Sequence, residues 1–523
     1  MDNRLCGELL SVTHPRCDMT ARRRGEPMRF RPCAAWLFAA ALTTPVFAGT
    51  LAQDIDAHIA QPRFEHARWG IEVIELGSGR VVYAHDAGKL FTPASTNKLY
   101  TAALALHVLG PAFRFPTRVF GAAPDHGGTI TGDAVLYGMG DPTLGTATLT
   151  ADWSDQMAVQ MTSLGIRRIR GDLVADDTFF STPPYGSGWE ADDLQAAYGA
   201  PPSALTVNDN VVQVTVAPGA SEGLPADLTL APSDGIAQLA NQLVTTTAGT
   251  RANVNLVRPA GARKLYAFGQ VPAGSSRSSY RLAVDDPARI AGSQLLGALQ
   301  RHGIRVDGIV RVAHWPQDSG ALRHNTTMLA EVQSPPVIDI LRDALKRSQN
   351  LYMQNLLLMA GVRTQATEPA PADRPGFINT EDWGIIGLRK LLDAADVPAD
   401  EYQYNEGSGL ARADLTTPHA MNRLLALLAA QPNAGQIMDT LPVAGIDGTL
   451  KSRMKGTAAE GNVRAKTGTL SQVRSLAGYV TTAHGQRLAF TIFLNHYDSP
   501  EGAPAATADI DAIAVRLANE GRP

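Results

Sequence analysis

One short stretch of the sequence has the residue types of an acyl-transfer site. Ser95 and Lys98 are separated by two residues in FTPASTNKLYTAALALH, residues 91–107. A serine hydroxyl is a poor nucleophile until a neighbouring base takes its proton, and a lysine can be that base if burial keeps it neutral. The pair therefore predicts a serine nucleophile with a lysine base.

The residues around this pair indicate what must position it. Thr92-Pro93-Ala94 is a typical helix start, and the positions that follow are apolar at helical spacing: Leu99, Ala102, Ala103, Leu106 and Leu109. Ser95 is then in the first turn of a buried helix, with Lys98 one turn further on the same face. Free backbone N–H groups at such a start can stabilise a developing oxyanion.

The Ser-x-x-Lys pattern is weak on its own, because Ser452 and Lys455 repeat it in the polar, turn-rich stretch GTLKSRMKGTAAEG. Two further motifs follow Ser95 in order. Ser348-Gln349-Asn350 lies between two helical patterns, and Lys466-Thr467-Gly468 lies on a predicted strand. The ordered set is that of the penicillin-interacting serine enzymes.

Each added motif supplies a group that the chemistry needs. The hydroxyl of Ser348 can relay a proton to the leaving amine, and the amide of Asn350 can hold Lys98 and the substrate backbone. Lys466 and Thr467 offer a cation and a hydroxyl to a carboxylate, and Lys466 would help to lower the pKa of Lys98. Gly468 would let substrate backbone lie against the strand edge.

On these motifs the chain resembles the penicillin-binding protein 4-like D-alanyl-D-alanine carboxypeptidase/endopeptidase family, the low-molecular-mass class C penicillin-binding proteins. The resemblance spans the mature chain and includes YGMGDPTLG, GWEADDLQAAYGAPPSALTVNDN, EGSGLARADLTTP and LPVAGIDGTL. It departs at Glu406, where an aspartate is expected, so no role of the shorter carboxylate is carried over.

The resemblance implies a periplasmic serine peptidase that acts on peptidoglycan stem peptides and D,D cross-links through an acyl-enzyme on Ser95. Penicillins would acylate the same serine, and no metal or organic cofactor would be needed. The N–H groups of Ser95 and Thr469 would form the oxyanion hole. The implied fold is α/β (α+β): a serine β-lactamase/DD-peptidase-like domain with an antiparallel sheet flanked by helices, interrupted by a β-rich insertion.

The order of predicted strands and helices along the chain agrees with this fold. Strand patterns at 70–86 precede the Ser95 helix, short alternating segments fill about 115–320, and helical patterns followed by strands return from about 330. We predict a DD-peptidase domain from 49–115 and 322–523. The inserted region, 116–321, would hold two nested domains, the inner one at roughly 145–230.

The N-terminal segment predicts export. Arg29 and Arg31, an apolar run and the small-residue site Val46-Phe47-Ala48 indicate a signal peptide at about 28–48. Met28 is the expected true start, and the alternative is that residues 1–27 are a real N-terminal extension. Cleavage would leave 39 basic and 46 acidic side chains, a net charge of −7, and no cysteine. Nucleic acid as a partner, a thiol nucleophile and a cysteine-based zinc site are thereby disfavoured, and no transmembrane segment is expected in the mature chain.

Other hydrolase classes fit less well. The Gly-x-Ser-x-Gly elbow fails at Glu406 in EGSGL, and no His-Glu-x-x-His zinc motif is present. Two alternatives stay open: a serine β-lactamase on the same scaffold, which the large insertion disfavours, and a non-catalytic cell-wall scaffold, which the three intact motifs disfavour.

Overall fold

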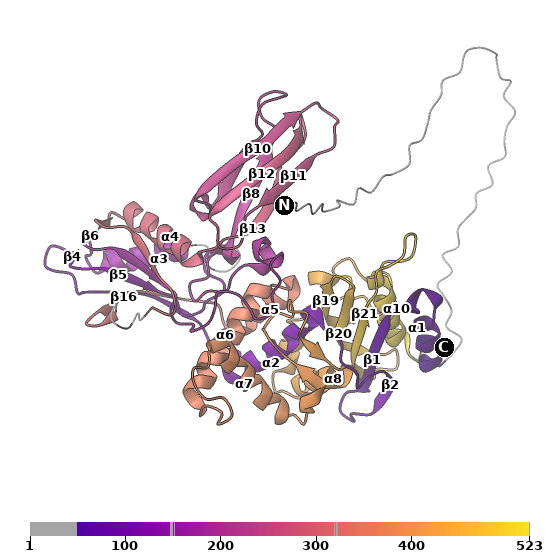
Figure 1. The fold of residues 1–523 in the computed structure, drawn as a ribbon. Coiled ribbons are helices and arrows are strands. Elements are labelled where there is room, and N and C mark those ends of the chain that lie inside the picture. Colours follow the sequence, from indigo (N-terminus) through magenta and orange to yellow (C-terminus); the bar gives the residue numbers. More distant parts are fainter. Residues whose placement is uncertain (1–49, 147–149, 151, 318–319, 321–322, 522–523) are drawn as a thin grey trace, which may run out of the picture. The chain divides into compact units, whose positions relative to one another are not determined.

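A five-stranded antiparallel sheet, called the central sheet below, is built from strands near both ends of the described chain (Figure 1). The computed structural model describes residues 50–521 except 147–149, 151, 318–319 and 321–322, so the predicted leader lies outside the described residues. The strand order is β19-β20-β21-β1-β2, with bounds β1 (Arg68–Glu75), β2 (Val81–His85), β19 (Arg464–Leu470), β20 (Val473–Thr481) and β21 (Arg487–Asn495).

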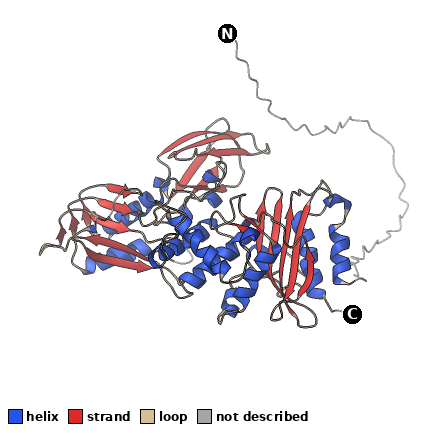
Figure 2. Ribbon diagram, turned by 60° about the horizontal axis from the view of Figure 1, so that its bottom comes forward, coloured by secondary structure: helices blue, strands red, loops and turns tan. Residues whose placement is uncertain are grey.

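Both faces of this sheet are covered, as the near-continuous apolar sequence of β21 requires. Phe490, Ile492 and Leu494 pack in one cluster with residues of α1 (Leu51–Ile59) and α10 (Ala506–Asn519). Ala489 and Phe493 point to the other face and pack in a second cluster with the central helices. Figure 2 shows helices on both sides of the sheet.

The central helices bring the first two motifs beside β19, which carries the third. Ser95 lies in a one-turn helix, Ala94–Asn97, directly before α2, and Asn350 begins α6, as the sequence predicts. The helices are α2 (Lys98–Val108), α5 (Val337–Arg347), α6 (Asn350–Thr367), α7 (Thr380–Asp393), α8 (Pro418–Ala429) and α9 (Ala434–Met438). The two short strands β17 (Tyr402–Gln403) and β18 (Leu415–Thr416) come between α7 and α8 in the sequence and form a two-stranded sheet.

The region between α2 and α5 is rich in strands, as predicted. Its first and last segments, 116–176 and 305–333, together form two sheets, called the outer part below. One has the order β15-β7-β5-β3-β16, the other β14-β6-β4. Their bounds are β3 (Pro116–Gly121), β4 (Thr129–Ile130), β5 (Ala134–Tyr137), β6 (Arg168–Ile169), β7 (Leu173–Asp176), β14 (Arg305–Val306), β15 (Val310–Ala313) and β16 (Thr327–Gln333).

Two helices also lie in this region, α3 (Trp153–Ser163) and α4 (Pro287–Arg301). The short alternating segments of about 115–320 predict strands with little long helix, yet α4 has 15 residues. Asp286 caps its first turn, Pro287 follows at the first helical position, and its apolar residues pack under the five-stranded sheet of the outer part. Tertiary packing of that apolar face explains a helix within a strand-rich segment.

A third group of strands lies at 211–283 and forms two three-stranded sheets, and Leu282 also forms an isolated bridge with Ala196. The sheets are β13-β8-β9 and β10-β12-β11, with bounds β8 (Val211–Ala217), β9 (Asp227–Ala231), β10 (Gln238–Thr246), β11 (Asn253–Val257), β12 (Lys264–Pro272) and β13 (Ser278–Ala283). This segment begins later than the inner domain predicted at roughly 145–230. The division into domains itself stays a prediction.

Candidate active site

Ser95 is held by a strained turn that is fastened to the central sheet. Ala94, just before it, has a left-handed backbone with φ of 49° and is fully buried. The carbonyl of Pro93 accepts hydrogen bonds from Thr96 Oγ1 at 2.8 Å and from Ser475 Oγ of β20 at 2.6 Å. The half-buried Ser95 is thereby presented to a cleft rather than to the core.

Lys98 lies behind Ser95 and is fully buried. Its Nζ is 2.7 Å from Ser95 Oγ, 2.6 Å from Asn350 Oδ1 and 2.6 Å from the carbonyl oxygen of Ser408. Burial lowers the pKa of Lys98 to about 7, although the carboxylates of Glu406 and Asp414 act to raise it. A substantial fraction of Lys98 is therefore neutral near pH 7.

The second motif lies at the junction of two helices. Ser348 ends α5 in a left-handed conformation, with φ of 59° and ψ of 41°, and Asn350 is the first residue of α6. This sharp reversal points both side chains toward Lys98 and Lys466: Asn350 accepts from Lys98, and Ser348 Oγ accepts from Lys466 Nζ at 2.9 Å.

The third motif lies on β19, at the edge of the central sheet. Lys466 is fully buried and also donates to the carbonyl of Thr467 at 2.7 Å. Burial and the neighbouring Lys98 lower its pKa well below the ordinary value. Burial is the largest cause of the lowered pKa at both lysines.

The backbone at Gly468 packs too closely against its neighbours to leave room for a side chain. A Cβ at this position would lie 2.0 Å from Ser475 Oγ and 2.6 Å from the carbonyl oxygen of Pro93. Any larger residue would push β19 away from the turn that carries Ser95. Thr469, the next residue, is exposed and lines the cleft.

Four of the predicted residues line one cleft of about 560 Å³. It is lined by Ser95, Ser348, Asn350 and Thr469, and further by Glu190, Asp193, Tyr198, Gly409, Leu410, Arg412, Leu470, Ser471, Arg474 and Asp498. Ser452 and Lys455, the second Ser-x-x-Lys pair, are exposed in a turn-rich segment. The structure thus brings the three motifs together and leaves the second pair out.

The loop at 406–410 contacts Lys98 through a backbone carbonyl. The buried Glu406 accepts hydrogen bonds from the N–H groups of Ser408, at 2.7 Å, and Leu410, at 2.8 Å. The carbonyl of Ser408 in turn accepts from Lys98. The sequence assigns no role to Glu406, and the backbone acceptor at Ser408 has no signature in the sequence.

No group of three or more histidine, cysteine, aspartate or glutamate side chains in the described part of the chain could hold a metal ion. Within the same residues, no helix has the length and apolar character needed to cross a lipid bilayer.

Comparison with known proteins agrees with this geometry. The D-Ala-D-Ala carboxypeptidase 3 (S13) family matches residues 51–519. The chain belongs to this family. It is 38% identical to the D-alanyl-D-alanine carboxypeptidase of Actinomadura sp. over 90% of its length and 84% of that protein. It is 24% identical to D-alanyl-D-alanine carboxypeptidase DacB of Haemophilus influenzae, over 89% and 92% of the two chains.

The fold is shared as well. The crystal structure of penicillin-binding protein 4 from Haemophilus influenzae aligns with a TM-score of 0.75, at 24% identity, over 89% of this chain and 98% of that one. The predictions of the family, the fold class and a D-Ala-D-Ala carboxypeptidase type of enzyme are confirmed. The roles of the individual site residues stay predictions.

Proposed function

We propose that this protein is a serine D-alanyl-D-alanine carboxypeptidase that hydrolyses peptidoglycan stem peptides through an acyl-enzyme on Ser95. The observation that carries the proposal is the 2.7 Å contact between Ser95 Oγ and the buried Nζ of Lys98, whose pKa of about 7 suits a general base. The family of the chain gives the substrate class.

The hydrogen bonds of Lys98 explain how it can accept the proton. A neutral amine has two N–H donors and one lone pair. Asn350 Oδ1 and the carbonyl of Ser408 can only accept, so they take the two donors and the lone pair is left for Ser95 Oγ. As Ser95 Oγ bonds to the substrate carbonyl, its proton passes to Lys98, and the N–H groups of Ser95 and Thr469 would hold the oxyanion.

Collapse of the tetrahedral intermediate breaks the carbon–nitrogen bond and needs a proton for the leaving amine. Ser348 Oγ, which accepts from Lys466, has a hydroxyl proton that it can give to this amine and replace from the lysines. Water then attacks the ester on Ser95 by the reverse sequence and releases the shortened peptide. Each proton taken from a nucleophile is thus returned to a leaving group.

Lys466 and Thr467 would bind the carboxylate beside the scissile bond. In a pentapeptide this carboxylate belongs to the terminal D-alanine, and in a diaminopimelate-type D,D cross-link it belongs to the D-configured centre of the leaving amine. The same subsite would therefore serve trimming and cross-link cleavage. A bound carboxylate favours the protonated form of Lys466, which burial disfavours.

Penicillins carry a carboxylate and a strained amide and would acylate Ser95 in the same way. The peptidoglycan substrate and the predicted signal peptide support a periplasmic location. For the chain itself, we propose that 49–115 and 322–523 form the penicillin-binding domain, with 116–321 inserted.

The test uses labelled benzylpenicillin and a D-Ala-D-Ala pentapeptide. A stable adduct together with release of D-alanine supports the peptidase. Rapid turnover of the penicillin would show a β-lactamase, and absence of both adduct and D-alanine would show a scaffold.

A further inference from the structure

The inserted region reaches the second motif through a backbone carbonyl. Asn350 Nδ2 donates to the carbonyl oxygen of Tyr198 at 2.9 Å, across 152 residues of sequence. A carbonyl can only accept, so the NH₂ group of Asn350 must face Tyr198, and Oδ1 must face Lys98. The insertion therefore fixes which way the Asn350 amide points.

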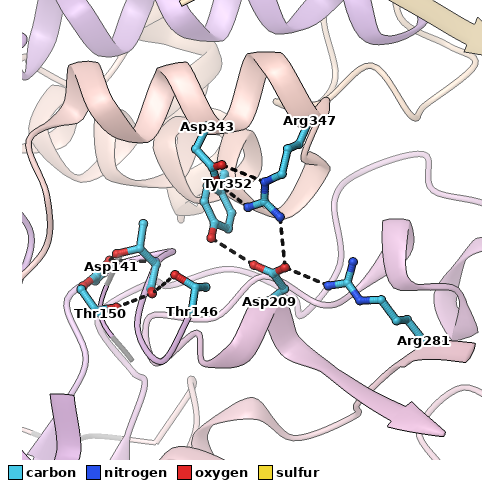
Figure 3. A network of polar contacts seen from close by, with 9 residues as sticks. Asp141, Thr146, Thr150, Asp209, Arg281, Asp343, Arg347 and Tyr352 are labelled. Carbon is cyan, nitrogen blue, oxygen red and sulfur yellow. Dashed lines mark hydrogen bonds and ion pairs between the residues drawn. The ribbon is translucent and has the colours of Figure 1, made fainter. Parts of the chain in front are cut away.

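The segment that carries this carbonyl is anchored by Asp209 (Figure 3). Asp209 Oδ1 accepts from Tyr352 Oη at 3.0 Å, and Oδ2 forms ion pairs with Arg281 at 2.8 Å and Arg347 at 3.4 Å. Arg347 directly precedes Ser348, and Tyr352 lies in the first turn of α6, after Asn350. One carboxylate of the insertion thus contacts both helices that flank the motif.

Asp209 lies in a left-handed turn that few residue types tolerate. Its backbone is left-handed, with φ of 56°, and its neighbours Asn208 and Asn210 both have φ of 53°. Aspartate and asparagine tolerate this conformation better than most residues. Asp209 is only 8% exposed and Tyr352 is fully buried, so solvent screens their contact little.

A second row of contacts holds the same segment along α6. Asn355 Nδ2 donates to the carbonyl of Ser203 at 3.1 Å and to Thr206 Oγ1 at 3.0 Å. Asn210 ties the segment to itself, because its Nδ2 donates to the carbonyl of Pro201 at 2.7 Å. The segment from Tyr198 to Asp209 is thereby held against α6 at several points, and Asp209 is the one that also reaches Arg347, directly before Ser348.

We infer that Asp209 is a positioning residue for the reaction, through which the inserted region holds Ser348 and Asn350 in their catalytic geometry. This role rests on the proposed function, since it concerns acylation of Ser95. It assigns the insertion a part in the chemistry besides any contact with the cell wall.

Asp176 provides a matched control. It is a fully buried carboxylate of the insertion that pairs with Arg323 at 2.6 Å and accepts from the N–H of Thr178 at 3.0 Å. Thr178 belongs to the inserted region, and Arg323 lies two residues beyond its predicted end at 321. Its loss should destabilise the insertion without disturbing the second motif.

The experiment follows benzylpenicillin acylation by stopped flow in the full chain, which separates the acylation rate constant from the dissociation constant. Asp209→Asn keeps a residue that tolerates the left-handed backbone and removes the charge. Because a small misplacement of catalytic groups slows reaction strongly, we expect its acylation rate constant to fall at least about tenfold, with the dissociation constant unchanged within about twofold. Asp176→Asn should lower the melting temperature and leave the rate constant unchanged.

Tyr352→Phe removes only the hydroxyl that Asp209 accepts from, so it should slow acylation in the same direction, and its effect should be less than additive with Asp209→Asn. Equal acylation rate constants in the wild type and Asp209→Asn, or an equal loss in Asp176→Asn, would overturn the positioning role alone. Absence of any adduct in the wild type would overturn the proposed function, and this role with it.

Discussion

Replacing Glu406 by glutamine tests how the base is supported. The two carboxylate oxygens of Glu406 each accept from a backbone N–H, that of Ser408 at 2.7 Å and that of Leu410 at 2.8 Å. Glutamine offers one oxygen, so its NH₂ group must face the N–H of Ser408 or that of Leu410, which would then keep only Ser408 Oγ, at 3.3 Å. The loop whose Ser408 carbonyl accepts from Lys98 would then lose one of its strong bonds to residue 406.

The size of the effect follows from this geometry. A buried hydrogen-bonding group left unsatisfied, together with loss of a charge-assisted bond, costs about 1.5 to 3 kcal/mol. If that cost falls on the reactive arrangement of Lys98, kcat/KM drops by roughly 10- to 150-fold. The lost negative charge has a separate consequence: Glu406 raises the pKa of Lys98, so its neutralisation lowers that pKa further below about 7.

The assay is kcat/KM for a D-Ala-D-Ala peptide as a function of pH. Activity requires neutral Lys98, so it falls as the pH drops through the pKa of this lysine, and the acid limb should move to lower pH in Glu406→Gln. Glu406→Asp keeps the charge while shortening the side chain, so its plateau should fall without this downward shift. An unchanged plateau and an unchanged acid limb in Glu406→Gln would refute this account of the loop.

Three further predictions follow from buried groups. Lys98→Arg, which stays charged, should be nearly as inactive as Lys98→Ala in peptide hydrolysis, and a substantially active arginine variant would require another base. Lys466→Ala should lower pentapeptide trimming and D,D cross-link cleavage alike by at least about tenfold, and spared cross-link cleavage would exclude a shared carboxylate subsite. Burial raises the pKa of Glu381 from 4.5 to about 7, so the folded chain binds this proton more tightly than the unfolded chain, and stability falls as pH rises across that interval, by on the order of 3 kcal/mol. Glu381→Gln should lessen this fall in melting temperature, and an identical pH dependence in both proteins would contradict it.

The sequence predicts the motifs well because each depends on a short pattern on one kind of element. Ser95 precedes a buried helix, Ser348 ends one helix where another begins, and Lys466 lies on a strand, as expected. Hydrophobic periodicity and turn residues are local properties, so they can be recognised directly in the sequence. The order of the motifs along the chain then identifies the family and its fold.

The supporting groups are not predictable in the same way. The carbonyl oxygens of Ser408 and Tyr198 are backbone acceptors, which every residue has, and only the folded chain brings them to Lys98 and Asn350. Nothing in the sequence distinguishes Asp209 from the other aspartates, because its contact with Tyr352 forms only in the folded chain. Long-range contacts of this kind depend on tertiary packing and leave no periodic trace.

Mass spectrometry after treatment with benzylpenicillin tests the central claim most directly. The account predicts one penicilloyl group in the wild type, on the proteolytic fragment that contains Ser95, none in Ser95→Ala, and an undiminished adduct in Ser452→Ala. An adduct that persists in Ser95→Ala, or that maps to another serine of the wild type, would contradict it.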